Sequence, residues 1–86
     1  MFRPAAAADA EEAFRWYENR RPGLGEEFLS EVSRAIRAVM ENPERYPVIH
    51  RRTRRALVSR FPYGIFYQVL EGQLVIVACF HAKRNP

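Results

Sequence analysis

Three side chains in this sequence carry the groups that metal-free phosphodiester cleavage needs. His81 can act as a general acid or base near neutral pH. Arg84 and Arg60 can bind a phosphate and neutralise its charge. Cleavage of RNA by this route requires a base for the 2′-hydroxyl, an acid for the leaving oxygen and cations on the scissile phosphate. These residues are therefore candidates for catalysis if the fold brings them together.

The densest charge lies in residues 50–55, which include Arg51, Arg52, Arg54 and Arg55. The net charge of the chain is +4, and it is unevenly distributed. Up to residue 49 there are seven Arg against nine Asp or Glu, whereas from residue 50 onward six Arg and one Lys face Glu71 alone. Clustered guanidinium groups attract acidic protein, RNA or DNA. The alternative is a solvated basic surface that keeps edge strands from aggregating.

Aromatic side chains supply the other candidate contacts. Trp16 lies outside the apolar stripes of the predicted helices, and an exposed tryptophan on a helix would mark an interface. Tyr63 and Tyr67 share a strand face with Ile65, which is compatible with core packing or with binding. The two histidines and Cys79 occupy unrelated positions, so we predict neither a metal site nor a cofactor. Cys79 lies within a predicted strand, which favours an unreactive core residue.

The first half of the chain predicts two helices. Residues 5–20 are rich in Ala, follow a proline suited to a first helical turn, and place apolar residues at helical spacing. Pro22 and Gly23 end this helix. Residues 25–41 form a second amphipathic pattern that stops at Asn42 and Pro43. The short break between them predicts an antiparallel helical hairpin.

The second half predicts a three-stranded antiparallel meander within residues 56–84, with a first strand through Phe61 and a hairpin turn at Gly72. Residues 50–55 are expected to be a solvated edge segment or a contact surface. Residues 1–3 are at most the stub of a strand. Both faces of the central strand are largely apolar, so we expect the helices to cover one face and leave the other for a partner.

These patterns predict a single α+β domain over residues 1–86, with a helical hairpin packed on a small antiparallel sheet. The sequence contains no run of about 18 apolar residues and no charged-then-apolar leader, so neither a membrane span nor a secretory signal is predicted. A single cysteine fits a reducing cytosol.

Several short motifs then follow one another in a definite order. They are Pro4 and Ala5; Glu12 and Ala13; Trp16, Tyr17 and Glu18; residues 22–25; Phe28 and Leu29; residues 42–44; Tyr46 and Pro47; residues 60–67; and residues 81–86. This ordered set spans nearly the whole chain and resembles the RelE/ParE superfamily of type II toxins, the plasmid-stabilisation proteins. The resemblance implies a small cytoplasmic bacterial toxin that is neutralised by an antitoxin.

The superfamily holds two activities on one fold. RelE-like members cut mRNA in the ribosomal A site, with basic side chains and often a tyrosine or histidine near the C-terminus. ParE-like members that have been characterised poison DNA gyrase. The RelE-like pattern has an arginine shortly after the tyrosine that opens the middle strand, where this chain has Gly64, and a late tyrosine, whereas this sequence ends at Pro86. The residues are therefore more similar to the ParE-like branch, although the first strand of that branch is short or missing here.

We thus expect a non-catalytic toxin that inhibits DNA gyrase and binds an antitoxin. The expected partner-binding residues are Trp16, Arg51, Arg52, Arg54, Arg55, Tyr63, Tyr67, His81 and Arg84. One alternative is a RelE-like mRNA endonuclease that uses His81, Arg84 and Arg60. Another is an inactive relic that binds only an antitoxin. Direct nucleic-acid binding is not expected to be the main function.

Overall fold

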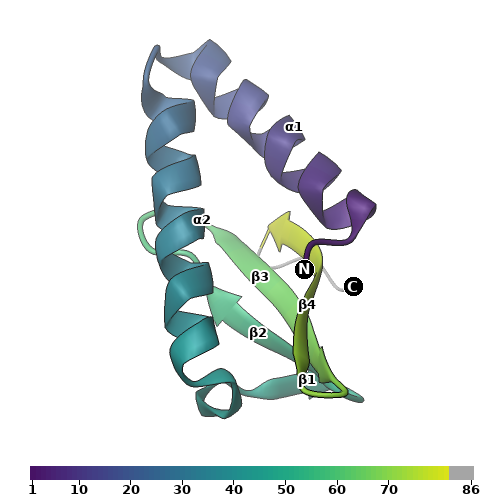
Figure 1. Ribbon diagram of the computed structural model, residues 1–86. Helices are drawn as coiled ribbons and strands as arrows, with labels where there is room; N and C mark the ends of the chain where they lie inside the picture. The colour runs from purple at the N-terminus through teal and green to yellow at the C-terminus, as the bar shows by residue number, and fades with distance from the viewer. Residues whose placement is uncertain (82–86) are drawn as a thin grey trace.

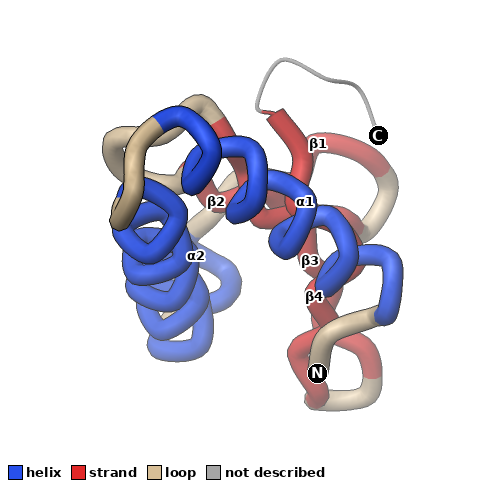
Figure 2. The backbone as a smooth tube through the Cα atoms, turned by 90° about the horizontal axis from the view of Figure 1, so that it is seen from above, coloured by secondary structure: helices blue, strands red, loops and turns tan. Residues whose placement is uncertain are grey.

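A computed structural model describes residues 1–81 of the chain. Two helices, α1 (Pro4–Arg20) and α2 (Leu24–Glu41), are followed by a 3-10 turn, η1 (Pro43–Arg45). Four strands then form one antiparallel sheet in sequence order: β1 (Val48–His50), β2 (Thr53–Leu57), β3 (Tyr63–Leu70) and β4 (Gln73–His81). The helices meet at the turn after α1 and spread apart toward the sheet (Figure 1). Seen from above, α1 runs across the sheet while α2 is viewed nearly end-on (Figure 2).

Both predicted helices are confirmed. Pro4 occupies the first turn of α1, and Ala6, Ala13 and Tyr17 form its buried face. In α2, acidic residues occupy the first turn, where the helix dipole favours negative charge. The buried face of α2 includes Phe28 and Val32. The expected α+β architecture, a helical hairpin on an antiparallel sheet, is also confirmed.

The turn between the helices depends on a carboxylate and a glycine. The backbone N–H groups of Gly23 and Gly25 donate to the two oxygens of Glu18, each at 2.9 Å. Glu18 therefore satisfies two donors at the N-terminus of α2 that have no partner within the helix. The two helices cross so closely at Gly25 that no side chain fits there. A Cβ atom at this position would lie 2.7 Å from the backbone oxygen of Phe14. Only glycine allows this approach.

The sheet differs from the expected three-stranded meander. Residues 50–55, expected as a solvated edge segment or contact surface, contribute to a β1–β2 hairpin. Its polar composition is compatible with a strand because the Arg54 guanidinium donates to the carbonyl oxygens of Tyr46 at 2.5 Å and Glu44 at 3.2 Å. The prediction that the first strand of the meander, which corresponds to β2, extends to Phe61 is also wrong. β2 ends at Leu57, and the chain turns through Arg60, which has a φ of 71°.

Residues 1–3 provide only a trace of an edge strand. This agrees with the expectation that they are at most the stub of a strand. Phe2 forms an isolated parallel bridge with Ile76 of β4. The N–H of Ile76 donates to the carbonyl of Met1 at 2.8 Å, and the N–H of Arg3 donates to the carbonyl of Ile76 at 2.9 Å. These bonds occupy part of the outer edge of β4.

The core lies between the helices and the sheet, where Phe28, Ile65 and Tyr67 are fully buried. The expectation of an uncovered apolar face on the opposite side is wrong at the centre of the sheet. Phe66 and Val75 are outside the main core cluster and yet are 1% and 5% exposed within the single chain. The central residues of that face are therefore not accessible to a partner.

We predict that Gly25→Ala lowers the free energy of unfolding by about 1 to 3 kcal/mol, because the added methyl group would collide with backbone at the helix crossing. The matched control is Gly64→Ala, whose Cβ atom would lie 3.1 Å from the side chain of Arg55, which can adjust. Urea unfolding followed by circular dichroism measures both. Equal losses in the two variants would contradict the tight crossing.

Candidate functional site

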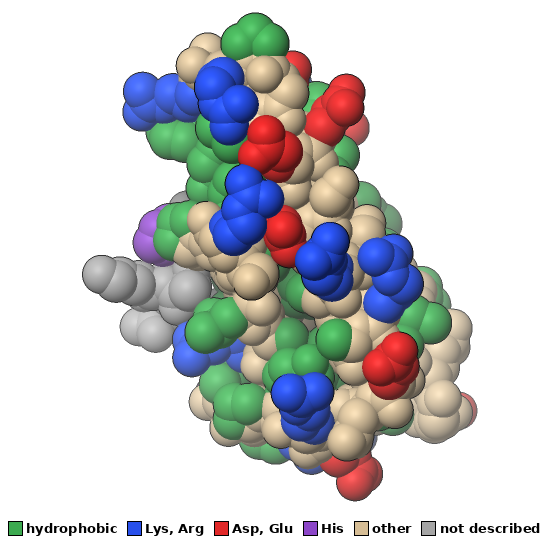
Figure 3. Space-filling model, turned by 90° about the vertical axis from the view of Figure 1, so that its left-hand side faces the viewer, with side chains coloured by type: hydrophobic (Ala, Val, Ile, Leu, Met, Phe, Trp, Pro, Cys, Tyr) green, Lys and Arg blue, Asp and Glu red, His purple; other side chains and the backbone are tan. Residues whose placement is uncertain are grey.

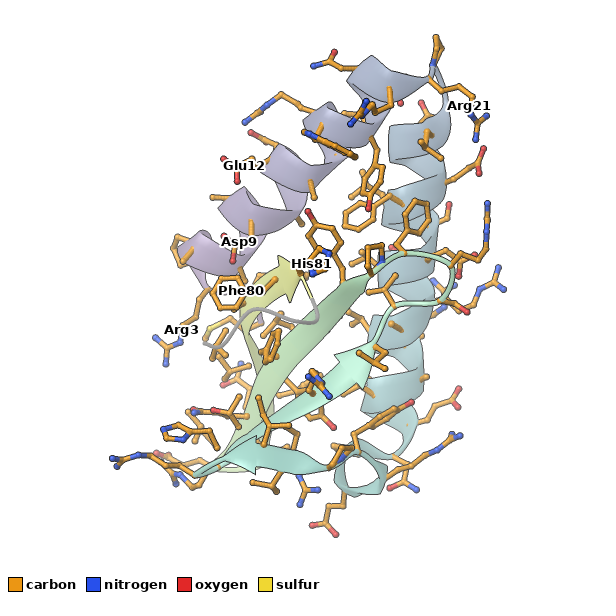
Figure 4. All side chains as sticks on the ribbon, turned by 180° about the vertical axis from the view of Figure 1, so that it is seen from behind. Arg3, Asp9, Glu12, Arg21, Phe80 and His81 are labelled. Carbon is orange, nitrogen blue, oxygen red and sulfur yellow. The ribbon has the colours of Figure 1, made fainter. Side chains whose placement is uncertain are left out.

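Three of the predicted partner-binding residues line one open groove. Trp16 of α1, Tyr63 at the start of β3 and His81 at the end of β4 border a cavity of about 740 Å³. Its other lining residues are Glu12, Ala13, Arg15, Tyr17 and Pro62. We call this cavity the Trp16 groove. His81 lies at the end of β4, below the part of α1 that carries Asp9 and Glu12 (Figure 4).

Aromatic contacts fix the floor and walls of the Trp16 groove. Tyr63 pairs with His81 across the β3–β4 ladder, and their rings are 5.8 Å apart. The Trp16 ring meets Tyr17 edge-on at 5.0 Å, and the Arg20 guanidinium lies 4.4 Å from the centre of the indole. Burial raises the pKa of Tyr17, with a smaller contribution from Tyr63. Trp16 nevertheless remains 52% exposed, which leaves indole surface for a partner.

Arg60 does not join His81 at the Trp16 groove in the described part of the chain. Its guanidinium bonds to Glu27 at 2.7 Å and to Glu31 at 3.4 Å, both on α2. In the space-filling view of the face that carries α2, acidic and basic side chains lie next to one another along this helix (Figure 3). Arg84, the other proposed phosphate ligand, lies outside the described residues. The described structure therefore does not assemble the three candidate nuclease groups.

The four arginines of residues 50–55 separate into different environments. Arg51 and Arg52 form the exposed β1–β2 turn. Arg54 is held by backbone carbonyls, and Arg55 packs its side chain beside Gly64. Thr53 bonds to Gln68 at 3.0 Å, near the end of β3 opposite Tyr63. Consequently the basic turn and the Trp16 groove lie at opposite ends of the sheet.

Tyr67 belongs to the core. It is 0% exposed, and its hydroxyl donates to the carbonyl oxygen of Pro43 at 2.5 Å. Burial raises the pKa of Tyr67. A partner therefore cannot contact Tyr67 unless the 3-10 turn moves.

Cys79 and His81 face the same side of β4 and border a small cavity of about 50 Å³ together with Asp9. Such a set resembles a nucleophile with its base and an orienting acid. However, burial and then the nearby Asp9 raise the pKa of Cys79 to about 12. The Asp9 carboxylate instead accepts the backbone N–H of Cys79 at 3.2 Å. This arrangement stabilises the edge of β4 and does not activate the thiol.

Within residues 1–81, no group of three or more His, Cys, Asp or Glu side chains is placed to hold a metal ion. Among the same residues, no helix combines the length and the apolar character needed to cross a bilayer.

The family model described as "ParE toxin of type II toxin-antitoxin system, parDE" matches residues 1–86. The chain belongs to the ParE toxin family. The resemblance to the ParE-like branch is therefore confirmed.

A solved structure gives independent support for the fold of this ParE-family chain. It is titled "Chromosomal ParDE TA system from P. aeruginosa" and superimposes with a TM-score of 0.83 at 14% sequence identity. The match covers 93% of this chain and 90% of that one. No curated protein matches the sequence.

Sequence reasoning missed two features of this ParE toxin. Pro62 was not among the expected contacts, but it lines the Trp16 groove. Glu31 was not singled out, although it is buried and bonded to Arg60. A signal was present, because Glu31 follows Phe28 by three residues and precedes Ala35 by four, so it lies along the apolar stripe of α2. A carboxylate at such a position requires a partner.

We predict that Cys79 in the native ParE toxin reacts with iodoacetamide about a thousandfold more slowly at pH 8 than an ordinary thiol. A pKa of about 12, against a usual 9.0, leaves about a thousandth of the usual thiolate. Mass spectrometry of the alkylated chain measures the rate, and the chain in denaturant is the control. Native labelling as fast as denatured labelling would mean that Cys79 is a reactive site.

The ion pairs of Arg60 generate a pH prediction. The hydrogen bond from Arg60 is the main cause that lowers the pKa of Glu27 below 4.5. Because the folded-state pKa is depressed, this pair stabilises the fold above pH 4.5 and ceases to do so as pH falls through the lowered pKa. Arg60→Met should therefore lower the urea midpoint near neutral pH and have less effect in acid.

Arg37→Met is the control for this experiment, since it removes an exposed guanidinium from α2, the helix that carries Glu27 and Glu31. Its effect on the urea midpoint should be small at every pH. A loss in Arg60→Met that is the same in acid and at neutral pH would contradict the assignment.

Proposed function

We propose that this ParE-family toxin inhibits DNA gyrase in the bacterial cytoplasm and is neutralised by a cognate antitoxin. The observation that carries the proposal is the Trp16 groove, where a half-exposed tryptophan is bordered by Tyr63 and His81. Such a groove accepts a protein segment with an apolar anchor, because tryptophan and tyrosine provide large contact areas at low entropic cost. Membership of a toxin-antitoxin family supports an antitoxin as the partner, whereas gyrase as the target rests on the resemblance to characterised ParE-like toxins.

The antitoxin acts in this account by covering the same surface. A segment with an apolar side chain against Trp16 would bury indole surface, at about 25 cal/mol for each Å². The exposed basic turn, Arg51 and Arg52, provides a second contact for acidic antitoxin residues. Arg84 remains a proposed contact outside the described residues. Raised salt should weaken the charged contact more than the apolar one.

The alternative of a ribosome-dependent endonuclease has less support. Its proposed phosphate ligand Arg60 is engaged by two carboxylates. An endonuclease would stop translation by cutting mRNA, whereas a gyrase inhibitor causes DNA damage. An SOS-response reporter in cells that express the chain separates the two, because only the second activity should induce it.

We predict that the purified chain inhibits plasmid supercoiling by gyrase at micromolar concentrations. Trp16→Ala should weaken this inhibition about tenfold or more, because truncating a central tryptophan of an interface costs at least about 1.4 kcal/mol. The matched control is Met40→Ala, which removes a residue that is 64% exposed and lies outside the groove. No inhibition by the unaltered chain would count against gyrase as the target. Equal inhibition by both variants would remove the Trp16 groove from the contact.

A further inference from the structure

The loop between β2 and β3, residues 58–62, has an unusual backbone. Arg60 adopts a φ of 71°, in the left-handed region that glycine and asparagine occupy more readily. The loop is closed by the N–H of Val58, which donates to the carbonyl of Tyr63 at 2.8 Å. A residue with a side chain persists in such a conformation when its surroundings hold it there.

The surroundings of Arg60 are two carboxylates of α2. Glu27 accepts from Nη2 at 2.7 Å, and Glu31 accepts from Nη1 at 3.4 Å. Arg21 lies 3.4 Å from Glu27, and Arg34 lies 4.0 Å from Glu31. Glu31 is 7% exposed, and its Oε1 has no hydrogen-bond partner within residues 1–81. A buried carboxylate needs a cation, so moving Arg60 away would leave Glu31 with only the distant Arg34 among the described side chains.

The residues that follow Arg60 form a wall of the Trp16 groove. Phe61 packs edge-on against Tyr17 at 4.9 Å and Phe28 at 5.3 Å. Pro62 and Tyr63 then line the groove that Trp16 also borders. The bonds of Arg60 to α2 therefore fix the position, relative to that helix, from which residues 61–63 continue into the groove wall.

We propose that the ion pairs of Arg60 with Glu27 and Glu31 position this wall of the Trp16 groove, so that Arg60 is a positioning residue for partner binding. The effect on the groove follows from the geometry alone, whereas the effect on gyrase inhibition rests on the proposed function. Arg60 contributes without contacting the partner, because it acts through Pro62 and Tyr63. A side chain held at a positive φ, where glycine would relieve the backbone, agrees with this role.

Trp16 is the only tryptophan of the chain and provides a direct readout of the groove. Its indole N–H gives a single signal in a ¹⁵N–¹H correlation spectrum. We expect Arg60→Met to shift or broaden this signal under conditions where circular dichroism shows the native fold, and to weaken gyrase inhibition about threefold or more. Arg60→Lys keeps a positive charge and should restore most of both properties. Arg37→Met should leave both unchanged.

If Arg60→Met does not fold, the same measurements are made on Arg60→Met combined with Glu31→Leu, which removes the buried charge as well. An unchanged indole signal and unchanged inhibition in a folded but less stable variant would overturn the proposal, because the ion pairs would then act on stability alone. A shifted indole signal in the variant, with no gyrase inhibition by the unaltered chain, would support the positioning role and refute the proposed function.

Discussion

Four aromatic rings hold together the part of the molecule that carries the Trp16 groove. Tyr17 of α1 and Phe28 of α2 lie 5.2 Å apart, and both contact Phe61 and Tyr63 at ring distances from 4.9 to 6.1 Å. The cluster therefore joins both helices to the β2–β3 loop and to the first residue of β3. Because Tyr17 neighbours Trp16 and Tyr63 neighbours His81, the shape of the Trp16 groove depends on this packing. Edge-to-face contacts between rings have a preferred geometry, which makes the cluster directional as well as apolar.

Two charged contacts complement the aromatic cluster at its borders. On one side the Glu18 carboxylate bonds to the start of α2 and sets the helix crossing. On another side Arg60 links the β2–β3 loop to Glu27 and Glu31. Each contact satisfies groups that would otherwise be left without partners, so each restricts the structure to one arrangement. The Trp16 groove is thus bordered by both ring packing and charged contacts, while the basic β1–β2 turn extends from the other end of the sheet.

The sequence predicted the elements with regular patterns and failed where single residues break a rule. The helices were predictable because the spacing of their apolar residues and their boundary residues indicate the same two segments. These boundary residues are Pro4, Pro22 and Asn42. β2 was misjudged because Arg54 looks solvated in sequence, whereas the carbonyls of Glu44 and Tyr46 bind its guanidinium. The role of Tyr67 was left open because its hydrogen bond to Pro43 spans 24 residues. The convergence of Trp16, Tyr63 and His81 also comes from tertiary packing, which no local pattern reveals.

The proposed function requires that the Trp16 groove is the surface that meets the target. Hydroxyl-radical footprinting of the toxin, alone and with an excess of gyrase, tests this most directly, because Trp16 and Met40 are both exposed and readily oxidised. We predict that gyrase protects Trp16 from oxidation and leaves the oxidation of Met40 unchanged. Protection of Met40 with undiminished oxidation of Trp16 would contradict it.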